Sequence, residues 1–94
     1  MSDHRATNII VQQVVRPSSE PEYRLIAYRT DCIFEPVIFQ SLDDLRRCLL
    51  GVAPGLDPEI IKEAEADITC IIFQHWLALS LQQLYDLGLT LRRG

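Results

Sequence analysis

The chain has 94 residues, of which 48% are hydrophobic and 23% charged, and its net charge is −4 at pH 7. This length supports one hydrophobic core, and the composition excludes an intrinsically disordered chain. The negative charge and the scattered arginines disfavour a nucleic-acid-binding protein, which concentrates Lys and Arg on one face. We therefore expect a single domain over residues 8–90, with flexible ends at 1–7 and 91–94.

Three strands are predicted in the first forty residues. Asn8–Val15 is rich in β-branched residues, and Glu22–Thr30 follows after a loop that contains two prolines and two serines. Cys32–Gln40 makes a third strand, but Pro36 has no N–H to donate to a neighbouring strand. This strand must therefore lie at an edge of the sheet or contain a bulge at Pro36.

Two short helices are predicted next. Ser41 is a favourable helix cap, and the leucines of Leu42–Leu50 recur at helical spacing until Gly51 ends the helix. An Asp-Pro pair then starts a second helix, Pro58–Ala66, because proline fits the first helical turn without losing a needed donor.

The most apolar stretch, Asp67–Leu79, contains the chain's only tryptophan, Trp76. Its β-branched and aromatic residues favour a strand, although the spacing of its isoleucines also fits a helix that continues the previous one. Both faces of such a strand are apolar. We therefore expect it to be central in the sheet and covered on both sides, with Trp76 largely buried.

A third helix completes the predicted order. Ser80 and Gln83 have the spacing of a capping box, and the helix should end at Leu87, before Gly88. The order strand, strand, strand, helix, helix, strand, helix predicts an α+β domain, in which a mainly antiparallel four-stranded sheet packs with three short helices.

If the fourth strand lies beside the first, this order resembles the start of a ribonuclease H-like fold and is similar to that of HicB-type antitoxin domains. The ribonuclease resemblance implies acidic residues that hold two metal ions, but the first strand has no carboxylate, and Asp43, Asp44 and Asp67 alone do not make that site. The turn and helix start of the antitoxins are also replaced, by Thr30-Asp31-Cys32 and by Asp43-Asp44-Leu45. The resemblance implies a fold and, as an alternative function, a HicB-like antitoxin or another nucleic-acid-associated regulator.

Residues with catalytic or metal-binding potential are few. Cys70 and His75 could act as nucleophile and base or as two metal ligands, but five residues apart on one strand they point to opposite faces. Cys32, Cys48, Cys70 and His75 have no recognisable ligand spacing, and no glycine-rich phosphate loop is present. We expect no catalytic residue, no metal and no cofactor. A small enzyme with an unrecognised site is the second alternative.

The three cysteines are an odd number without a Cys-x-x-Cys pair, which indicates reduced thiols in a cytoplasmic protein. No signal-like segment precedes the first predicted strand, and the longest apolar run is too short to cross a bilayer. We expect a soluble intracellular protein that does not contact membranes.

The apolar strand surface exceeds what three short helices readily cover, which predicts a protein-interaction or oligomerisation module without catalytic activity. A homodimer is expected, because an unpaired apolar edge invites a second copy. The contact should involve Trp76 or the strand Cys32–Gln40, with these candidates: Phe34, Pro36, Ile38, Gln74, His75 and Trp76. The competing expectation is that helices cover both faces of the sheet within one subunit.

Overall fold

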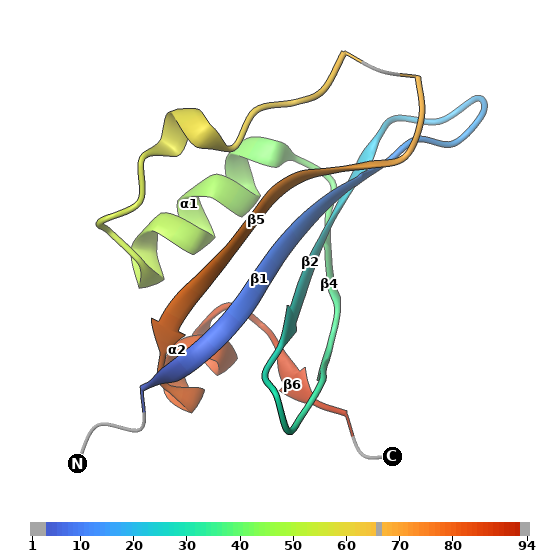
Figure 1. The fold of residues 1–94 in the computed structure, drawn as a ribbon. Helices are drawn as coiled ribbons and strands as arrows, with labels where there is room; N and C mark the ends of the chain where they lie inside the picture. Colours follow the sequence, from blue (N-terminus) through green and yellow to red (C-terminus); the bar gives the residue numbers. More distant parts are fainter. Residues whose placement is uncertain (1–3, 66, 93–94) are drawn as a thin grey trace.

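A computed structural model describes residues 4–65 and 67–92. The chain forms an α+β domain with a four-stranded antiparallel sheet, as predicted. The elements, shown in Figure 1, are β1 (Arg5–Val14), β2 (Glu22–Tyr28), β3 (Phe34–Glu35), β4 (Val37–Phe39), α1 (Leu42–Val52), the 3-10 turn η1 (Pro58–Ile60), β5 (Cys70–Leu79), α2 (Leu81–Asp86) and β6 (Thr90–Leu91).

The main sheet has the strand order β4-β2-β1-β5, and every neighbouring pair is antiparallel. The stretch for which strand and helix were both open is a strand, and it pairs with β1. β1 begins at Arg5, so residues 5–7, which were predicted to belong to a flexible arm, are paired with β5. These three residues have no strand pattern of their own, and it is the partner strand that orders them.

β5 lies at an edge of the sheet, and the prediction of a central strand covered on both sides is wrong. β1 occupies the position between β2 and β5, so β5 has a strand on one side only. Apolar residues on both faces of a strand indicate that burial of both faces is favourable. They do not indicate whether helices of the same chain or another molecule cover those faces.

The predicted strand Cys32–Gln40 is divided at Pro36, which follows β3 and precedes β4. β4 pairs with β2 at the other edge of the main sheet, as the missing proline N–H predicted, whereas β3 pairs with β6 in a separate two-stranded sheet. This small sheet orders part of the predicted C-terminal tail. The Arg92 N–H donates to the carbonyl of Ile33 at 2.9 Å, and its guanidinium donates to Glu35 at 3.0 Å. Residues 1–3 and 93–94 lie outside the described residues.

α1 begins where predicted, with the Ser41 hydroxyl accepting a hydrogen bond from the Asp44 N–H at 3.4 Å. The helix was predicted to end before Gly51, but it continues through Gly51 to Val52. A glycine permits a helix end without requiring one, and a Cβ at Gly51 would meet no atom within 4 Å, so this position does not require glycine for close packing.

The second predicted helix is wrong beyond its first turn. The Asp57 carboxylate does accept a hydrogen bond from the Glu59 N–H at 3.0 Å, but η1 is a 3-10 turn that ends at Ile60. Residue 66, the predicted end of this helix, lies outside the described residues.

The buried side chain of Gln13 holds the chain that follows η1. Its Oε1 accepts from the Ala64 N–H at 3.0 Å, and its Nε2 donates to the Ala64 carbonyl at 3.2 Å. A side-chain amide thus takes the place of a peptide group from a neighbouring strand. These bonds satisfy backbone groups that a continued helix would have used, which is the physical reason why the helix stops.

α2 has the predicted capping box. The Gln83 N–H donates to the Ser80 hydroxyl at 3.1 Å, and the Ser80 N–H donates to Oε1 of Gln83 at 2.8 Å. Leu87 caps the end of the helix, and Gly88 follows with a φ of +91°, in the left-handed region that glycine adopts without strain.

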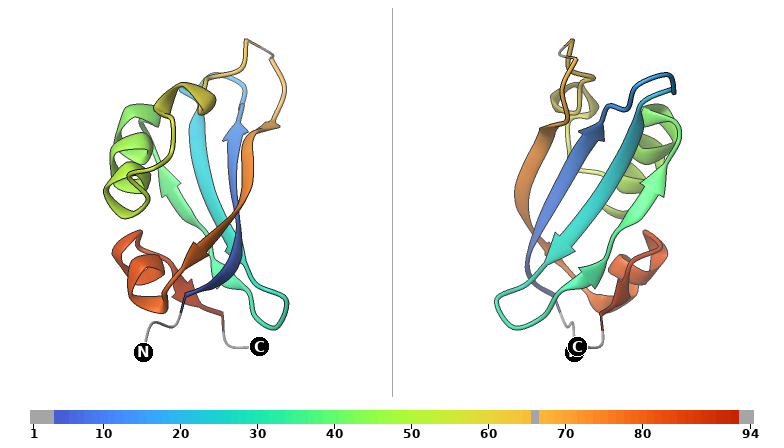
Figure 2. Two further views of the ribbon diagram at one scale, coloured as in Figure 1. Left: turned by 60° about the vertical axis from the view of Figure 1, so that its left-hand side comes forward. Right: turned by 90° about the vertical axis from the view of Figure 1, so that its right-hand side faces the viewer.

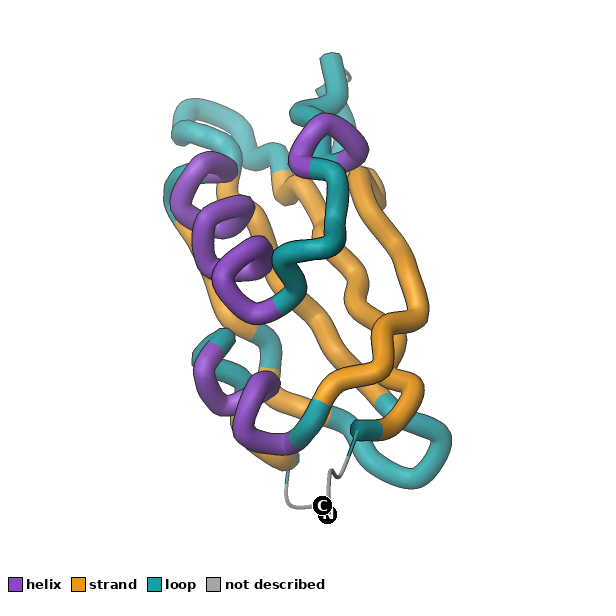
Figure 3. Tube along the Cα trace, turned by 90° about the vertical axis from the view of Figure 1, so that its left-hand side faces the viewer, coloured by secondary structure: helices purple, strands orange, loops and turns teal. Residues whose placement is uncertain are grey.

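Both helices cover the same face of the sheet, as Figures 2 and 3 show, and no described element covers the opposite face. The expectation that helices cover both faces within one subunit is therefore wrong. The core lies between the helices and the covered face and includes the fully buried residues Ile9, Val11, Leu25, Ala27, Leu45, Leu49, Ile61, Leu84 and Leu89. Among the described residues, no helix is long and apolar enough to span a membrane.

Candidate interaction surface

The uncovered face of the sheet carries side chains from all four strands. Directly paired residues of antiparallel strands point to the same side, so the strand registers arrange these side chains in rows across the sheet. The rows are Tyr28–Asn8–Trp76, Ile26–Ile10–Gln74 and Ile38–Arg24–Gln12–Ile71, and these ten residues are called the open face below.

The open face exposes large apolar side chains at both sides of the sheet. Ile38 on β4 is 52% exposed, and Ile71 and Trp76 on β5 are 56% and 52% exposed. Between them, Ile10 and Ile26 are half-buried by their neighbours in the sheet. Several large exposed apolar side chains on one face of a sheet are typical of a contact with another molecule.

The prediction that Trp76 is largely buried is wrong, because Trp76 lies on the open face and is 52% exposed. Its ring meets the ring of Tyr28 edge to face across β1, with centroids 5.9 Å apart, and Asn8 is buried in the same row. Asn8 Nδ2 donates to the Tyr28 hydroxyl at 2.6 Å. Among the described residues, Asn8 Oδ1 has no hydrogen-bond partner. The aromatic pair thus shields an amide whose hydrogen bonding is incomplete.

Arg24 is the only ionised side chain in the three rows. Its partners in the strand registers, Gln12 and Ile38, offer no carboxylate, and its Nε is buried without a hydrogen-bond partner in the described part of the chain. The open face therefore combines apolar side chains with one positive charge that no residue of the three rows neutralises.

Three of the six residues predicted for an interface lie on the open face: Ile38, Gln74 and Trp76. Phe34, a fourth predicted residue, is 1% exposed and belongs to the hydrophobic core. Pro36 is exposed at the break between β3 and β4, away from the three rows.

His75, the sixth predicted residue, is exposed on the other side of β5, where its ring centroid lies 5.4 Å from that of Phe73. Cys70 lies on that same side, contrary to prediction, because the register of β5 against β1 shifts by one residue at a β-bulge. Their partners on β1 are Gln13 for Cys70 and Ile9 for His75. These two partners are four residues apart on β1, a distance of about 13 Å along the strand. Cys70 and His75 are therefore too far apart to act as nucleophile and base or to bind one metal ion.

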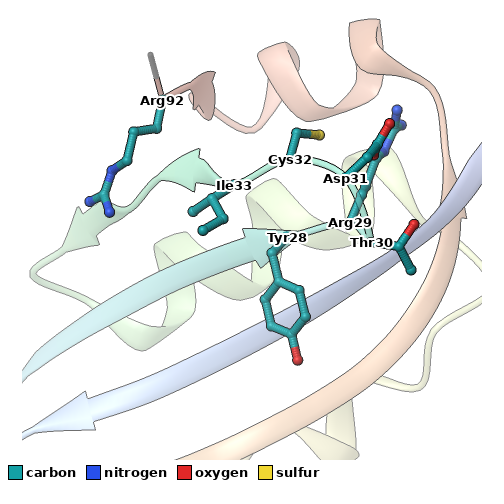
Figure 4. Close-up of a pocket in the computed structure, with 7 residues that line it drawn as sticks. All are labelled: Tyr28, Arg29, Thr30, Asp31, Cys32, Ile33 and Arg92. Carbon is teal, nitrogen blue, oxygen red and sulfur yellow. The ribbon is translucent and has the colours of Figure 1, made fainter. Parts of the chain in front are cut away.

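An open depression of about 810 Å³ adjoins the open face at the end of β2 (Figure 4). Its charged groups are engaged within the chain: Arg5 donates to Asp31 at 3.2 Å, and Arg92 pairs with Glu35. Burial, and then Asp31, raise the pKa of the Cys32 thiol, which is therefore protonated near neutral pH and a poor nucleophile. The depression is lined by Tyr28, Arg29, Thr30, Asp31, Cys32, Ile33 and Arg92.

A polar hollow of about 330 Å³ lies at the start of α1 and is lined by residues that include Glu20, Tyr23, Asp43, Arg46 and Glu63. The Tyr23 hydroxyl donates to Glu63 at 2.8 Å, and burial together with this carboxylate raises the pKa of Tyr23 to about 12. Tyr23 is thus a hydrogen-bond donor and not a base near neutral pH. Within 4–65 and 67–92, no three or more His, Cys, Asp or Glu side chains are grouped to hold a metal ion.

Most of the open face was missed in the sequence. Asn8, Ile10 and Gln12 alternate along β1, and Arg24 and Ile26 do so along β2, so the rows were visible as alternating positions. Alternation separates two faces of a strand without indicating which face the helices cover. That information lies in the packing of α1 and α2.

No family model, no curated protein and no solved structure matches the chain.

Proposed function

We propose that the chain is a small protein-interaction module without catalytic activity of its own, and that the open face is its contact surface. The observation that carries the proposal is the exposure of Ile38, Ile71 and Trp76 on a sheet face that no described helix covers. Removing such side chains from water stabilises a complex by about 25 cal/mol for each Å² of apolar area. Half-exposed tryptophan is also a residue type that contributes strongly to protein interfaces.

The chemistry of the open face favours a partner different from the chain itself. Arg24 lacks a carboxylate within the three rows, and a second copy placed face to face would bring another Arg24 against it. The nearest acid of the same face, Glu22 in the next row, is already paired with Arg16 at 3.4 Å. A fitting partner brings apolar side chains for Ile38 and Trp76 and one acidic group for Arg24. The cytoplasm is the proposed location, because the three cysteines are free thiols.

The open face can be tested by capture of proteins from an extract of the cells in which the chain occurs. We expect Ile38→Asp to reduce the recovery of a distinct set of proteins at least about tenfold, because a carboxylate would be desolvated in the contact. Ile68→Asp is the matched control, since Ile68 is 67% exposed in the loop before β5 and lies off the open face. It should recover the same proteins as the unaltered chain.

Circular dichroism must show that both variants remain folded. Equal recovery by Ile38→Asp and Ile68→Asp would contradict the proposal, whatever proteins are recovered. Arg24→Gln should weaken the same interactions in a salt-sensitive way, because it removes the single positive charge of the rows.

The proposed lack of catalytic activity leads to a separate prediction about metal ions and ATP. Mg²⁺, Zn²⁺ or ATP at millimolar concentration should change the melting temperature by less than about 1 °C, since a ligand that binds only the native state must stabilise it. Thermal unfolding followed by circular dichroism measures this. A rise of several degrees would favour the small enzyme, and tight, salt-sensitive binding of a nucleic acid would favour the regulator.

A further inference from the structure

The outer edge of β5 is a second exposed feature, distinct from the open face. β5 pairs with β1 along one side, and along its other side no strand of the described chain is paired with it. The right-hand view of Figure 2 shows β5 at the margin of the sheet. Unpaired N–H and C=O groups along such an edge can form hydrogen bonds with another strand.

β5 lacks most of the features that block pairing at an edge. Its residues, Cys70–Leu79, include no Lys, Arg, Asp, Glu, Pro or Gly. Its bulge falls near its start, between Ile71 and Phe73, which leaves the regular stretch 73–79. The opposite edge of the sheet differs, because β4 has three residues and follows Pro36 directly.

We propose that β5 pairs with β5 of a second copy, antiparallel and about a two-fold axis, so that two four-stranded sheets become one continuous sheet. A strand meets its own copy antiparallel when the axis is perpendicular to the sheet, and each copy then contributes the same residues. The uncharged strand brings no like charges together. Pairing of β5 with β4 of another copy would engage only three residues, so the symmetric pair is favoured over an open chain of copies.

This inference goes beyond the proposed function, because edge pairing leaves the open face of each copy uncovered. The two open faces would then lie side by side on one sheet. The edge contact and the face contact therefore respond to different substitutions.

Sedimentation at tens of micromolar provides the test. The unaltered chain should sediment as a dimer, and His75→Lys, which alters β5 outside the open face, should have a dissociation constant at least about tenfold higher, because it places like charges along the pairing edge. His4→Lys is the matched control. It makes the same chemical change at an exposed position outside β5 and should remain a dimer.

Ile38→Asp separates the edge from the face. It should leave the dimer intact while it reduces capture of other proteins, whereas His75→Lys should do the reverse. A monomeric unaltered chain, an edge variant that stays dimeric, or dissociation by Ile38→Asp would each overturn the proposal. Hydrogen exchange of the unaltered chain gives a measurement without any variant: amides of β5 that point away from β1 should exchange more slowly as the protein concentration rises.

Discussion

Leu45→Ala is expected to lower the free energy of unfolding by about 3 kcal/mol, within the range of about 2–5 kcal/mol seen when a buried leucine is truncated. Leu45 is fully buried in the core between α1 and the sheet. The loss combines the transfer free energy of the removed methyl groups with the cavity that they leave. It is a large part of the total stability of a small domain, about 5–15 kcal/mol.

Urea unfolding followed by far-ultraviolet circular dichroism measures this loss. Leu91→Ala is the control, because the Leu91 side chain lies half-exposed on β6, and its truncation should cost less than about 1 kcal/mol. Equal losses for the two variants would show that α1 does not pack on the sheet as described.

Arg29→Met is expected to cost about 2–4 kcal/mol, because the loss of a buried charged donor leaves its acceptors without partners. Arg29 is only 5% exposed. Its Nε donates to the Thr7 hydroxyl at 3.0 Å, and its Nη2 donates to the carbonyl of Leu79 at 2.7 Å. One guanidinium thus joins the end of β2 to β1 and to the last residue of β5. Methionine keeps much of the side-chain volume and removes every donor.

The control is Arg16→Met. Arg16 forms an exposed ion pair with Glu22 at 3.4 Å, and such pairs contribute about 0–1 kcal/mol. Denaturant unfolding of both variants under the same conditions compares them directly. If Arg29→Met proved no more costly than Arg16→Met, the assigned role of the buried guanidinium would be wrong.

Features that depend on interactions between residues close together in the chain were predicted correctly from the sequence. The Ser41 cap, the capping box of Ser80 and Gln83, and the edge position expected from Pro36 all occur as predicted. Each of them depends on a backbone group within three or four residues, so the sequence contains both partners of the interaction.

The errors concern contacts between residues far apart in the chain. The clamp of Gln13 on Ala64 stops a predicted helix, and the position of β1 between its neighbours makes β5 an edge strand. The candidate surface was found only in part for the same reason. Trp76 was singled out because it is unusual, whereas Ile10, Ile26 and Arg24 became a surface only when both helices packed on the opposite face.

The bulge in β5 also bears on how the chain can change in length. Val11 is paired with Phe73 and Gln12 with Ile71, so Ile72 is the one residue of this stretch that the β1 ladder does not pair. Deletion of Ile72 would restore strict alternation and leave every neighbour on its present side of the sheet. A deletion within 73–79 would instead move every residue between the deletion and the bulge to the opposite face of the sheet. Deletion of Ile72 would therefore keep the strand register while it removes a side chain that packs against the core, whereas any deletion within 73–79 would also change the faces of the strand.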